Sequence, residues 1–266
     1  MIESDSFVIS MNSQLKSERH RQIRQFIQEN GQATVSELCS LFNVSPATIR
    51  RDLEEMDSMG WIMRDHGGAL RIEPKAVEPP ILKRIGILTE EKQRIGQAAA
   101  QLVNSGETIF IGSGTTTLEV ARHLNVGGSL TVITNALNIA YELVNDGTIT
   151  LIVIGGLVRN SELSLIGHIT EQALKELRAD KVFLGIHAVS IRDGLTNDYL
   201  PETMTDRAIL QIASETILVA DHTKLGKVAT SHVAPITAIS KLVTDRKAAP
   251  EFISEVEALG IETILA

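Results

Sequence analysis

One short segment, Ser-Pro-Ala-Thr-Ile-Arg-Arg-Asp-Leu from Ser45 to Leu53, carries the residue types best suited to chemistry. Arginine can donate twice to a guanine edge or clamp a phosphate, and threonine can contact a phosphate or a thymine methyl group. Ser45 is a favoured helix N-cap, and Pro46 fits the first helical position because its missing N–H needs no partner there. The segment therefore predicts a capped helix that presents DNA-reading side chains.

The apolar residues indicate which face of this helix is buried. At about 100° per residue, three side chains share one face: Ile49, Leu53 and Met56. The candidate DNA contacts are the cap and the residues on or beside the opposite face: Ser45, Ala47, Thr48, Arg50 and Arg51. The alternative is a solvated face on which the arginines pair with nearby acids: Asp52, Glu54 and Glu55. The neighbouring segments favour DNA binding.

Those neighbouring segments predict a small domain around the helix. Residues 17–30 have helical spacing and end at Gly31, and Thr34 with Glu37 forms a capping box for a second helix. We expect its apolar residues, Leu41 among them, to pack against the third helix, which ends near Gly60. Two strand-like runs follow, residues 61–64 and 67–72. Three helices and a hairpin are typical of a winged helix-turn-helix domain, which we place at residues 15–72 after a flexible extension, residues 1–14.

Charge and composition are compatible with a DNA-binding protein. The 266-residue chain has a formal net charge of −8, but residues 13–75 hold nine Lys/Arg against nine Asp/Glu, so the acid excess lies mainly elsewhere. Local basic patches, rather than the total charge, set the attraction to phosphate. No apolar run is long enough to cross a membrane, and the first twelve residues lack the features of a secretory signal. With a single cysteine, we expect a cytoplasmic protein.

The remainder of the chain predicts a second, α/β domain. Residues 73–88 contain three prolines and are interpreted as a linker, followed by a domain over residues 89–266. Apolar, Val/Ile-rich runs predict seven strands: residues 108–111, 130–134, 148–154, 181–186, 216–220, 241–244 and 262–265. Helical stretches separate most of them, for example residues 90–103, 116–124 and 136–145. Strands this apolar are buried on both faces, so a mostly parallel sheet covered by helices is expected.

Residues able to bind a ligand follow several of these strands. Gly112-Ser-Gly-Thr-Thr-Thr117 lies between a strand and a helix, where backbone N–H groups and hydroxyls suit a phosphate. Comparable residues end three further strands: Thr134-Asn135, Gly155-Gly156 and Asp221-His-Thr-Lys224. Open parallel sheets bind ligands beyond the carboxyl ends of their strands, which is where these residues lie. The alternatives are a plain turn at residues 112–117 and a surface lysine at Lys224.

The DNA-reading segment resembles the signature of the DeoR-type bacterial regulators. The matching residues are Arg19, Ile23, Ile27, Ser45, Thr48, Ile49, Arg50, Arg51, Asp52 and Leu53. Arg64-Asp-His-Gly-Gly-Ala69 is similar to that family's wing. The resemblance implies that Thr48, Arg50 and Arg51 contact operator DNA and that Arg64 and His66 reach the backbone or minor groove. Asp52 is interpreted as an internal partner of an arginine.

The likeness extends to residue 266. The segments SGTTT, TNALNIA, IGG, FLG, DGLT and ADHTK occur in the order of the DeoR-type sensor domain, which is similar in fold to ribose-5-phosphate isomerase. It implies a phosphorylated sugar as effector, bound by Ser113, Gly114, Thr115, Thr116, Asn135, Gly156, Arg207 and Lys224. Two positions depart from the family pattern: Gly112 stands where many members have Asp, and Asp206 replaces a basic residue.

The sequence predicts a transcriptional regulator of sugar metabolism genes, a repressor controlled by a sugar phosphate, rather than an enzyme. Two half-sites need two reading helices, so a homodimer or homotetramer on double-stranded DNA is expected. The alternative is an isomerase-like enzyme, for which the nearest candidate bases are Asp198, Glu202, Asp206 and Asp221. The histidines and the cysteine show no metal-ligand spacing, and neither a metal nor another cofactor is expected.

Overall fold

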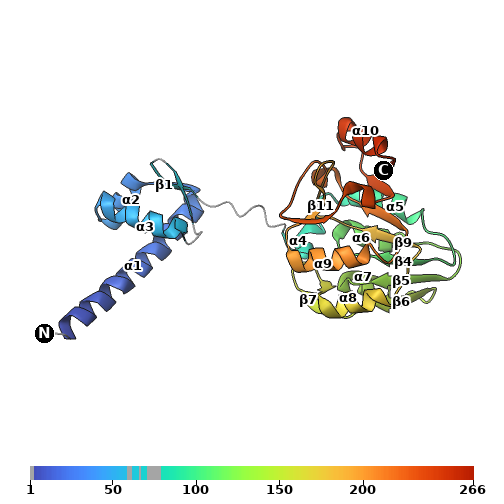
Figure 1. Cartoon of the computed structure of the whole chain (residues 1–266), viewed down its shortest axis with the longest axis horizontal. Coiled ribbons are helices and arrows are strands. Elements are labelled where there is room, and N and C mark those ends of the chain that lie inside the picture. The colour runs from blue at the N-terminus through green and yellow to red at the C-terminus, as the bar shows by residue number, and fades with distance from the viewer. Residues whose placement is uncertain (1–2, 59–61, 66, 71–78) are drawn as a thin grey trace. The chain divides into compact units, whose positions relative to one another are not determined.

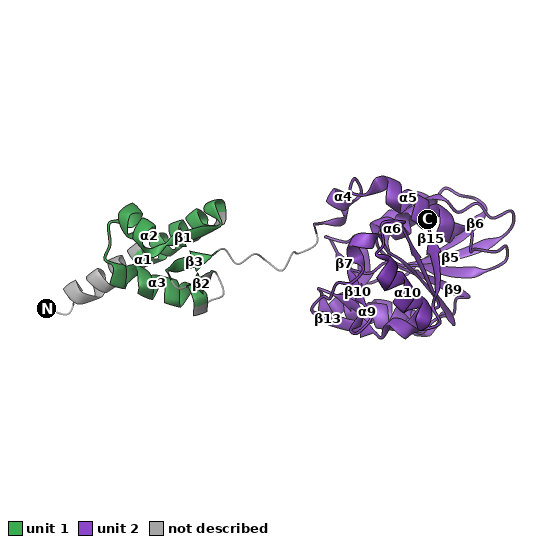
Figure 2. Cartoon of the chain, turned by 90° about the horizontal axis from the view of Figure 1, so that it is seen from above, with its two compact units in different colours: residues 1–77 green, residues 78–266 purple. Residues whose placement is uncertain are grey.

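A computed structural model describes residues 3–58, 62–65, 67–70 and 79–266 of the chain. The chain divides into two compact units, residues 1–77 and residues 78–266 (Figure 2).

The N-terminal unit has the predicted winged helix-turn-helix arrangement. Its elements are α1 (Glu3–Asn30), β1 (Gln32–Thr34), α2 (Val35–Phe42), α3 (Pro46–Ser58), β2 (Met63–Asp65) and β3 (Gly68–Leu70). The strands form an antiparallel sheet in the order β1-β3-β2, so the predicted hairpin is present, and its described strands cover residues 63–65 and 68–70. The third strand, β1, was not predicted because three residues are too few to show an alternating pattern.

Two segments of this unit differ from the prediction. Helix α1 begins at Glu3, inside the expected flexible extension, because residues 3–30 contain no glycine or proline to break it before Gly31. Leu41 is 55% exposed, so it lies outside the core that it was expected to join.

Part of the expected linker belongs to the C-terminal unit. Helix α4 (Ile81–Arg84) lies within it, and the Ile81 side chain is fully buried. The Ile81 N–H donates to the Ser161 carbonyl at 2.7 Å, and the Arg84 guanidinium forms a buried ion pair with Glu162. Residues 79–88 are therefore packed on this unit, since proline-rich composition indicates turns and not necessarily a free linker.

All seven predicted strands form one parallel sheet in the C-terminal unit (Figure 1). They are β4 (Thr108–Ile111), β5 (Leu130–Thr134), β6 (Ile149–Val153), β9 (Lys181–Leu184), β12 (Glu215–Val219), β14 (Lys241–Thr244) and β15 (Glu262–Leu265). The order across the sheet is β15-β14-β12-β9-β4-β5-β6. The chain thus starts in the middle at β4, builds outward to β6, and returns to β9 on the other side of β4.

Helices cover both faces of this sheet, as predicted. One face packs against α5 (Thr89–Ala100), α6 (Thr115–Arg122) and α7 (Leu137–Leu143). The other packs against α8 (His168–Lys175), α9 (Leu200–Ile209) and α10 (Pro250–Ala258). Successive residues of a strand face opposite sides, so Ile109 and Ile111 enter the first core and Phe110 the second.

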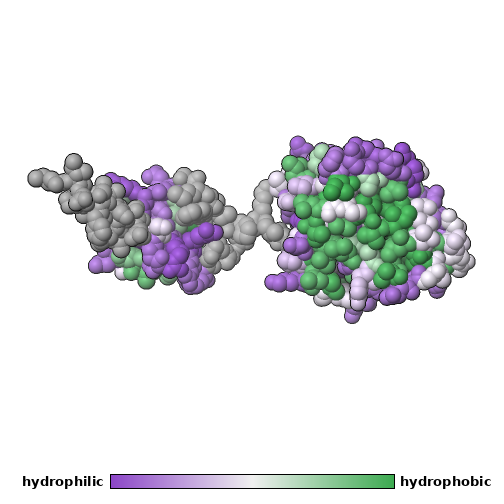
Figure 3. All heavy atoms as spheres, turned by 90° about the horizontal axis from the view of Figure 1, so that it is seen from below, coloured by the Kyte–Doolittle hydropathy of each residue, from purple (hydrophilic) through white to green (hydrophobic). Residues whose placement is uncertain are grey.

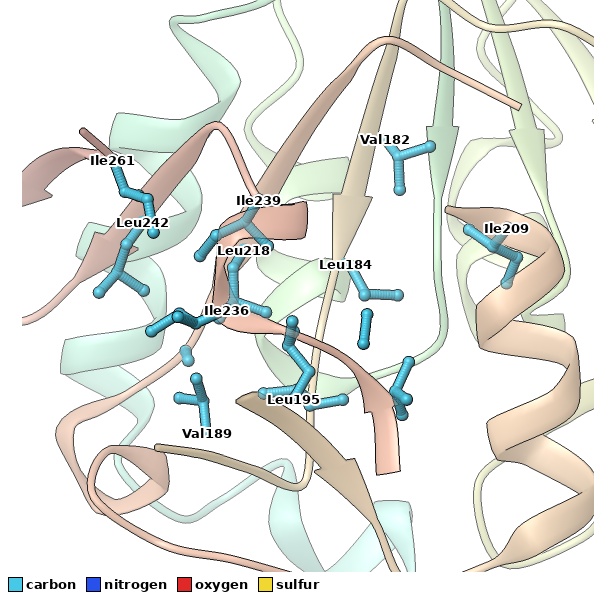
Figure 4. Close-up of a cluster of buried hydrophobic side chains, with 14 of the residues drawn as sticks. Val182, Leu184, Val189, Leu195, Ile209, Leu218, Ile236, Ile239, Leu242 and Ile261 are labelled. Atoms are coloured by element: carbon cyan, nitrogen blue, oxygen red, sulfur yellow. The ribbon is translucent and has the colours of Figure 1, made fainter. Parts of the chain in front are cut away.

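Short strands that the sequence analysis did not predict complete the second face. They are the hairpin β7 (Leu157–Arg159) and β8 (Ser164–Ile166), and the antiparallel sheet β10 (Ala188–Ser190), β11 (Gly194–Asn197) and β13 (Ser231–Ala234). Two single-turn 3-10 helices are η1 (His222–Lys224) and η2 (Ile236–Ala238). Figure 4 shows how side chains of this small sheet, such as Leu195, meet Leu184 and Leu218 of the large sheet.

Candidate DNA-binding surface and effector site

Helix α3 begins with the predicted cap. The Thr48 N–H donates to the Ser45 side-chain oxygen at 3.3 Å, and the two hydroxyls lie 3.0 Å apart. The Thr34 capping box of α2 is also present, with the Thr34 N–H donating to Glu37 at 2.7 Å. Helices α2 and α3 therefore each begin at a capped residue, and the caps help to set the direction of α3.

The two faces of α3 differ as the periodicity predicts. Ile49, Leu53 and Met56 are buried in the core of the N-terminal unit. Ala47, Arg50 and Arg51 are exposed, and Thr48 is partly exposed. Arg50 and Arg51 have no ion-pair or hydrogen-bond partner in the described part of the chain. A rigid helix thus presents two available guanidinium groups, the arrangement that contact with base edges or phosphates requires.

Asp52 joins α3 to α1. Its carboxylate accepts hydrogen bonds from Arg19 at 2.6 and 3.1 Å, and the His20 Nε2 atom lies 3.0 Å away. Burial alone would raise the Asp52 pKa, but the hydrogen bonds from Arg19 and His20 outweigh it and hold this pKa below its ordinary value. Asp52 is therefore the internal partner of an arginine, as predicted.

Other bases of the N-terminal unit already have acidic partners. Arg21 pairs with Glu18 on α1, and Lys16 pairs with Glu55. Arg64 on β2, a candidate DNA contact, pairs with Glu54 at 3.1 Å. These pairs leave Arg50 and Arg51 as the more available donors. The other candidate wing residue, His66, lies outside the described residues.

A close backbone approach holds the wing against the helices. The Val35 N–H donates to the Gly67 carbonyl at 3.0 Å. A Cβ on Gly68 would lie 2.1 Å from the Ala33 carbonyl oxygen, so only glycine fits there. The Gly-Gly sequence is thus a packing requirement of the β1–β3 pair as well as a turn.

In the C-terminal unit, the predicted glycine-rich loop lies where the strand order reverses. The chain runs from β4 to β5 on one side and later returns to β9 on the other, so the reversal lies between β4 and β9. Open parallel sheets bind ligands beyond the carboxyl ends of strands at such a point. The Gly112 N–H donates to the Phe183 carbonyl of β9 at 2.9 Å, which places residues 112–117 beside this reversal.

The loop requires glycine at Gly114 but not at Gly112. Gly114 has φ +147°, and the Thr117 hydroxyl donates to its carbonyl at 3.1 Å. Ser113 is partly exposed, whereas Thr115 and Thr116 are buried at the start of α6. A Cβ on Gly112 would make only ordinary contacts at 3.5 Å, so the departure from Asp there is not a requirement of packing.

Two asparagines follow β5. Asn135 is buried, its amide nitrogen donates to the Leu165 carbonyl at 3.1 Å, and its side-chain oxygen has no partner among the described residues. Neither polar atom of the Asn138 side chain has one, although both atoms are buried. Sequence analysis missed Asn138; its signal is its spacing three residues after Asn135. Buried amides without partners are costly unless a ligand or water satisfies them.

The three other candidate effector residues lie on different elements. Gly156 lies after β6, where a Cβ would meet the Thr170 hydroxyl oxygen at 2.0 Å. Lys224 is half-buried at the end of η1. The Arg207 guanidinium donates to the carbonyls of His232 and Val233 on β13, so it is already hydrogen-bonded to the small antiparallel sheet. Arg207 is therefore not available as a free cation for the loop at residues 112–117.

The four candidate bases each have a partner. Asp221 caps η1 by accepting from the Thr223 N–H at 3.0 Å, and Asp198 pairs with His187 at 2.9 Å. Glu202 forms an ion pair with Arg159, which was not a predicted residue. Asp206 accepts from the Asn197 amide at 2.5 Å.

The Asp206 carboxyl group differs from an ordinary acid. Burial, together with the nearby negative charge of Glu202, raises the Asp206 pKa well above its ordinary value, although the Asn197 hydrogen bond acts in the opposite direction. The structure thus places a buried carboxyl group with a raised pKa where the family pattern has a basic residue.

Among the described residues, no cluster of three or more His, Cys, Asp or Glu side chains is arranged to hold a metal ion. No described helix is long and apolar enough to span a membrane.

The fold and the α3 surface define a winged helix-turn-helix protein with a separate α/β domain. Residues 19–75 match the family model of the DeoR-like helix-turn-helix domain, and residues 88–246 match that of the DeoR C-terminal sensor domain. The chain belongs to the DeoR family of transcriptional regulators, which confirms the predicted resemblance.

Named relatives support this membership. The glycerol-3-phosphate regulon repressor of Escherichia coli (strain K12) is 34% identical over 244 residues, which cover 92% of this chain and 95% of that protein. The HTH-type transcriptional repressor GlcR of Bacillus subtilis (strain 168) is 30% identical over 250 residues, covering 94% and 96%. A solved ribose 5-phosphate isomerase A from Methanocaldococcus jannaschii is similar over 52% of this chain and 54% of its own, with 19% identity and a TM-score of 0.38. That score is too low to support an inference.

Proposed function

We propose that this regulator is a repressor whose α3 helix binds operator DNA through Thr48, Arg50 and Arg51. The observation that carries the proposal is a pair of arginines, without partners among the described residues, on the exposed face of a helix whose other face is buried. Two copies place two such helices on a two-fold symmetric operator. The protein then acts in the bacterial cytoplasm, on the nucleoid when DNA-bound.

The proposed effector is a phosphorylated sugar bound at the reversal between β4 and β9. Support comes from the backbone N–H groups at the start of α6 and from the Asn135 amide oxygen, which has no partner in the described part of the chain and suits a sugar hydroxyl. The E. coli relative is named as the repressor of the glycerol-3-phosphate regulon, and here that name supports the class of effector. Binding then shifts the equilibrium between states that bind DNA differently.

The DNA proposal is tested with a duplex that the wild-type chain selects from a random-sequence library. We expect Arg51→Ala to weaken binding of that duplex by about 1–3 kcal/mol at matched salt, without a change in melting temperature. Arg21→Ala is the matched control, because Arg21 is equally an exposed arginine but is paired with Glu18. Equal losses in the two variants would show that only overall charge matters and would refute the assignment to α3.

The effector proposal is tested by a thermal-shift screen of phosphorylated sugars and their unphosphorylated counterparts. A ligand that binds only the folded state raises the melting temperature, and an Asn135→Ala variant should lose that response. Release of the selected duplex by the same compound connects binding to regulation. Turnover of the bound sugar phosphate would instead favour the isomerase-like enzyme, since we propose binding without catalysis.

A further inference from the structure

The hairpin of β7 and β8, residues 157–166, joins an exposed strand to a buried one. All three residues of β8 are buried, whereas Leu157 and Val158 of β7 are 69% and 42% exposed. Figure 3 shows a broad apolar area on the C-terminal unit, on the side where Figure 1 places β7 and α8. The hairpin lies outside the seven-stranded sheet, and a two-stranded hairpin is only marginally stable by itself. Its contacts with neighbouring elements therefore fix its position.

The base of the hairpin is tied to a candidate effector residue. The Leu165 N–H donates to the Asn135 carbonyl at 2.7 Å, and the Asn135 side-chain amide donates to the Leu165 carbonyl at 3.1 Å. On the side of α9, the Ser164 hydroxyl donates to the Glu202 carboxylate at 3.0 Å, and Arg159 forms an ion pair with the same carboxylate. A ligand that bonds to the side-chain oxygen of Asn135 therefore acts on a residue already fastened to β8.

The tip of the hairpin is tied to the first residues of this unit. The Ile81 N–H of α4 donates to the Ser161 carbonyl at 2.7 Å. Arg84 of α4 forms an ion pair with Glu162, and only 11% and 12% of these two side chains are exposed. Figures 1 and 2 both place α4 and β7 on the same side of the C-terminal unit. Along the chain, α4 is the first described helix after the DNA-binding unit, so the tip holds the segment through which the two units are connected.

The turn between the base and the tip has a fixed conformation. The Glu162 N–H donates to the Arg159 carbonyl at 3.1 Å and closes the turn. Leu163 has φ +52°, in the left-handed region that a leucine rarely adopts, and its carbonyl accepts from the Leu137 N–H at 2.8 Å. Such a conformation persists only where the surrounding structure holds it. The base and the tip are therefore joined by a short, constrained segment, which can transmit a displacement from one to the other.

We propose that the β7–β8 hairpin couples the effector site to residues 79–88, so that a change at Asn135 alters how firmly α4 is held. The inference rests on the proposed function for the identity of the effector site. Coupling between distant sites is carried by contiguous packed and hydrogen-bonded groups, and here such contacts run from Asn135 through β8 and the turn to α4. Arg84 and Glu162 are then positioning residues, which act on regulation without contacting the effector or the DNA.

Hydrogen exchange of the full chain without DNA or sugar tests the coupling, with peptides that cover residues 79–88 as the readout. Asn135→Ala removes the side-chain hydrogen bond to Leu165 at the base, and Glu162→Gln removes the ion pair with Arg84 at the tip. Each variant should speed the exchange of residues 79–88 roughly tenfold, about the effect of one lost hydrogen bond. Because both changes act on one connection, the double variant should exchange no faster than the faster single variant.

Thr196→Val is the matched control, because Thr196 and Asn135 are both 2% exposed and the Thr196 hydroxyl donates to the Ala188 carbonyl in the small sheet. It should leave the exchange of residues 79–88 unchanged, whereas Ser164→Ala, a second change at the base, should speed it. Wild-type exchange of β4 and β14 peptides verifies that the variants fold.

Three outcomes would overturn the coupling: unchanged exchange of residues 79–88 in both variants at the base, an equal effect of Thr196→Val, or multiplied effects in the double variant. None of these outcomes involves a ligand or a duplex, so the proposed function would stand. A thermal-shift screen without any response would refute the effector proposal and leave the measured link between Asn135 and α4 intact.

Discussion

Each unit buries an aspartate, and the surroundings give the two carboxyl groups opposite properties. Asp52 on α3 is 2% exposed and meets two basic side chains, which hold its pKa below the ordinary value despite burial. Asp206 on α9 is 7% exposed and meets an amide and a nearby carboxylate, so burial and repulsion raise its pKa well above that value. Burial acts to raise both pKa values; at Asp52 the hydrogen bonds from Arg19 and His20 outweigh it, whereas at Asp206 the Asn197 hydrogen bond and the charge of Arg159 do not. Asp52 anchors a helix through its basic partners, whereas the Asp206 carboxyl group has a raised pKa.

The largest expected effect concerns Asp52, which joins α3 to α1. Asp52→Ala leaves Arg19 and His20 without their common partner, so the free energy of unfolding of the N-terminal unit should fall by about 3–5 kcal/mol. Native-state hydrogen exchange of α1–α3 amides in the full chain measures this without requiring the two units to unfold together. Glu54→Ala, an exposed position on the same helix, is the control. Equal effects at the two positions would contradict the anchoring role.

The contributions of Asp52 and Asp206 to the pH dependence of stability should have opposite signs. The folded-state pKa of Asp52 is lowered, so its stabilising contribution is present above about pH 4 and is lost as pH falls through the folded value. The folded-state pKa of Asp206 is raised, so its contribution is present below about pH 4 and is lost as pH rises through the folded value. One proton limits each slope to about 1.4 kcal/mol per pH unit.

Unfolding in urea at several pH values checks these signs. Pulse labelling at one fixed pH then shows, from the peptides of each unit, how far that unit has unfolded. Asp206→Asn should remove the loss of stability of the C-terminal unit as pH rises and leave the N-terminal unit unchanged. Asp52→Asn should alter only the N-terminal unit at low pH. The same slope in wild type and Asp206→Asn would mean that another group dominates the C-terminal unit.

The sequence was sufficient for features that depend on neighbours along the chain. The cap of α3 and its buried Ile49, Leu53 and Met56 follow from local chemistry and periodicity, and seven continuous apolar runs predicted the strands of the large sheet. Three-residue strands such as β1 carry too short a pattern. The contact of Arg207 with β13 and the pair of Arg159 with Glu202 join residues 25 to 43 positions apart, which no local pattern specifies. The place of the glycine-rich loop between a strand and a helix was therefore predictable from the sequence, but the direction of several side chains around it was not.

The smallest expected effect concerns an ion pair that, unlike Asp52 and Asp206, lies in exposed side chains. Arg64 and Glu54 form an ion pair whose side chains are 41% and 71% exposed, so Arg64→Ala should change the free energy of unfolding of the N-terminal unit by less than about 1 kcal/mol. If Arg64 leaves Glu54 to contact a phosphate, the same variant should also reduce the salt dependence of duplex binding by about one counterion. Glu54→Gln should then strengthen binding, because it releases Arg64 and removes a negative charge from α3. If the salt dependence of duplex binding is unchanged in both variants, Arg64 does not contact a phosphate. If Arg64→Ala lowers the free energy of unfolding as much as Asp52→Ala does, an exposed ion pair contributes as much as a buried one.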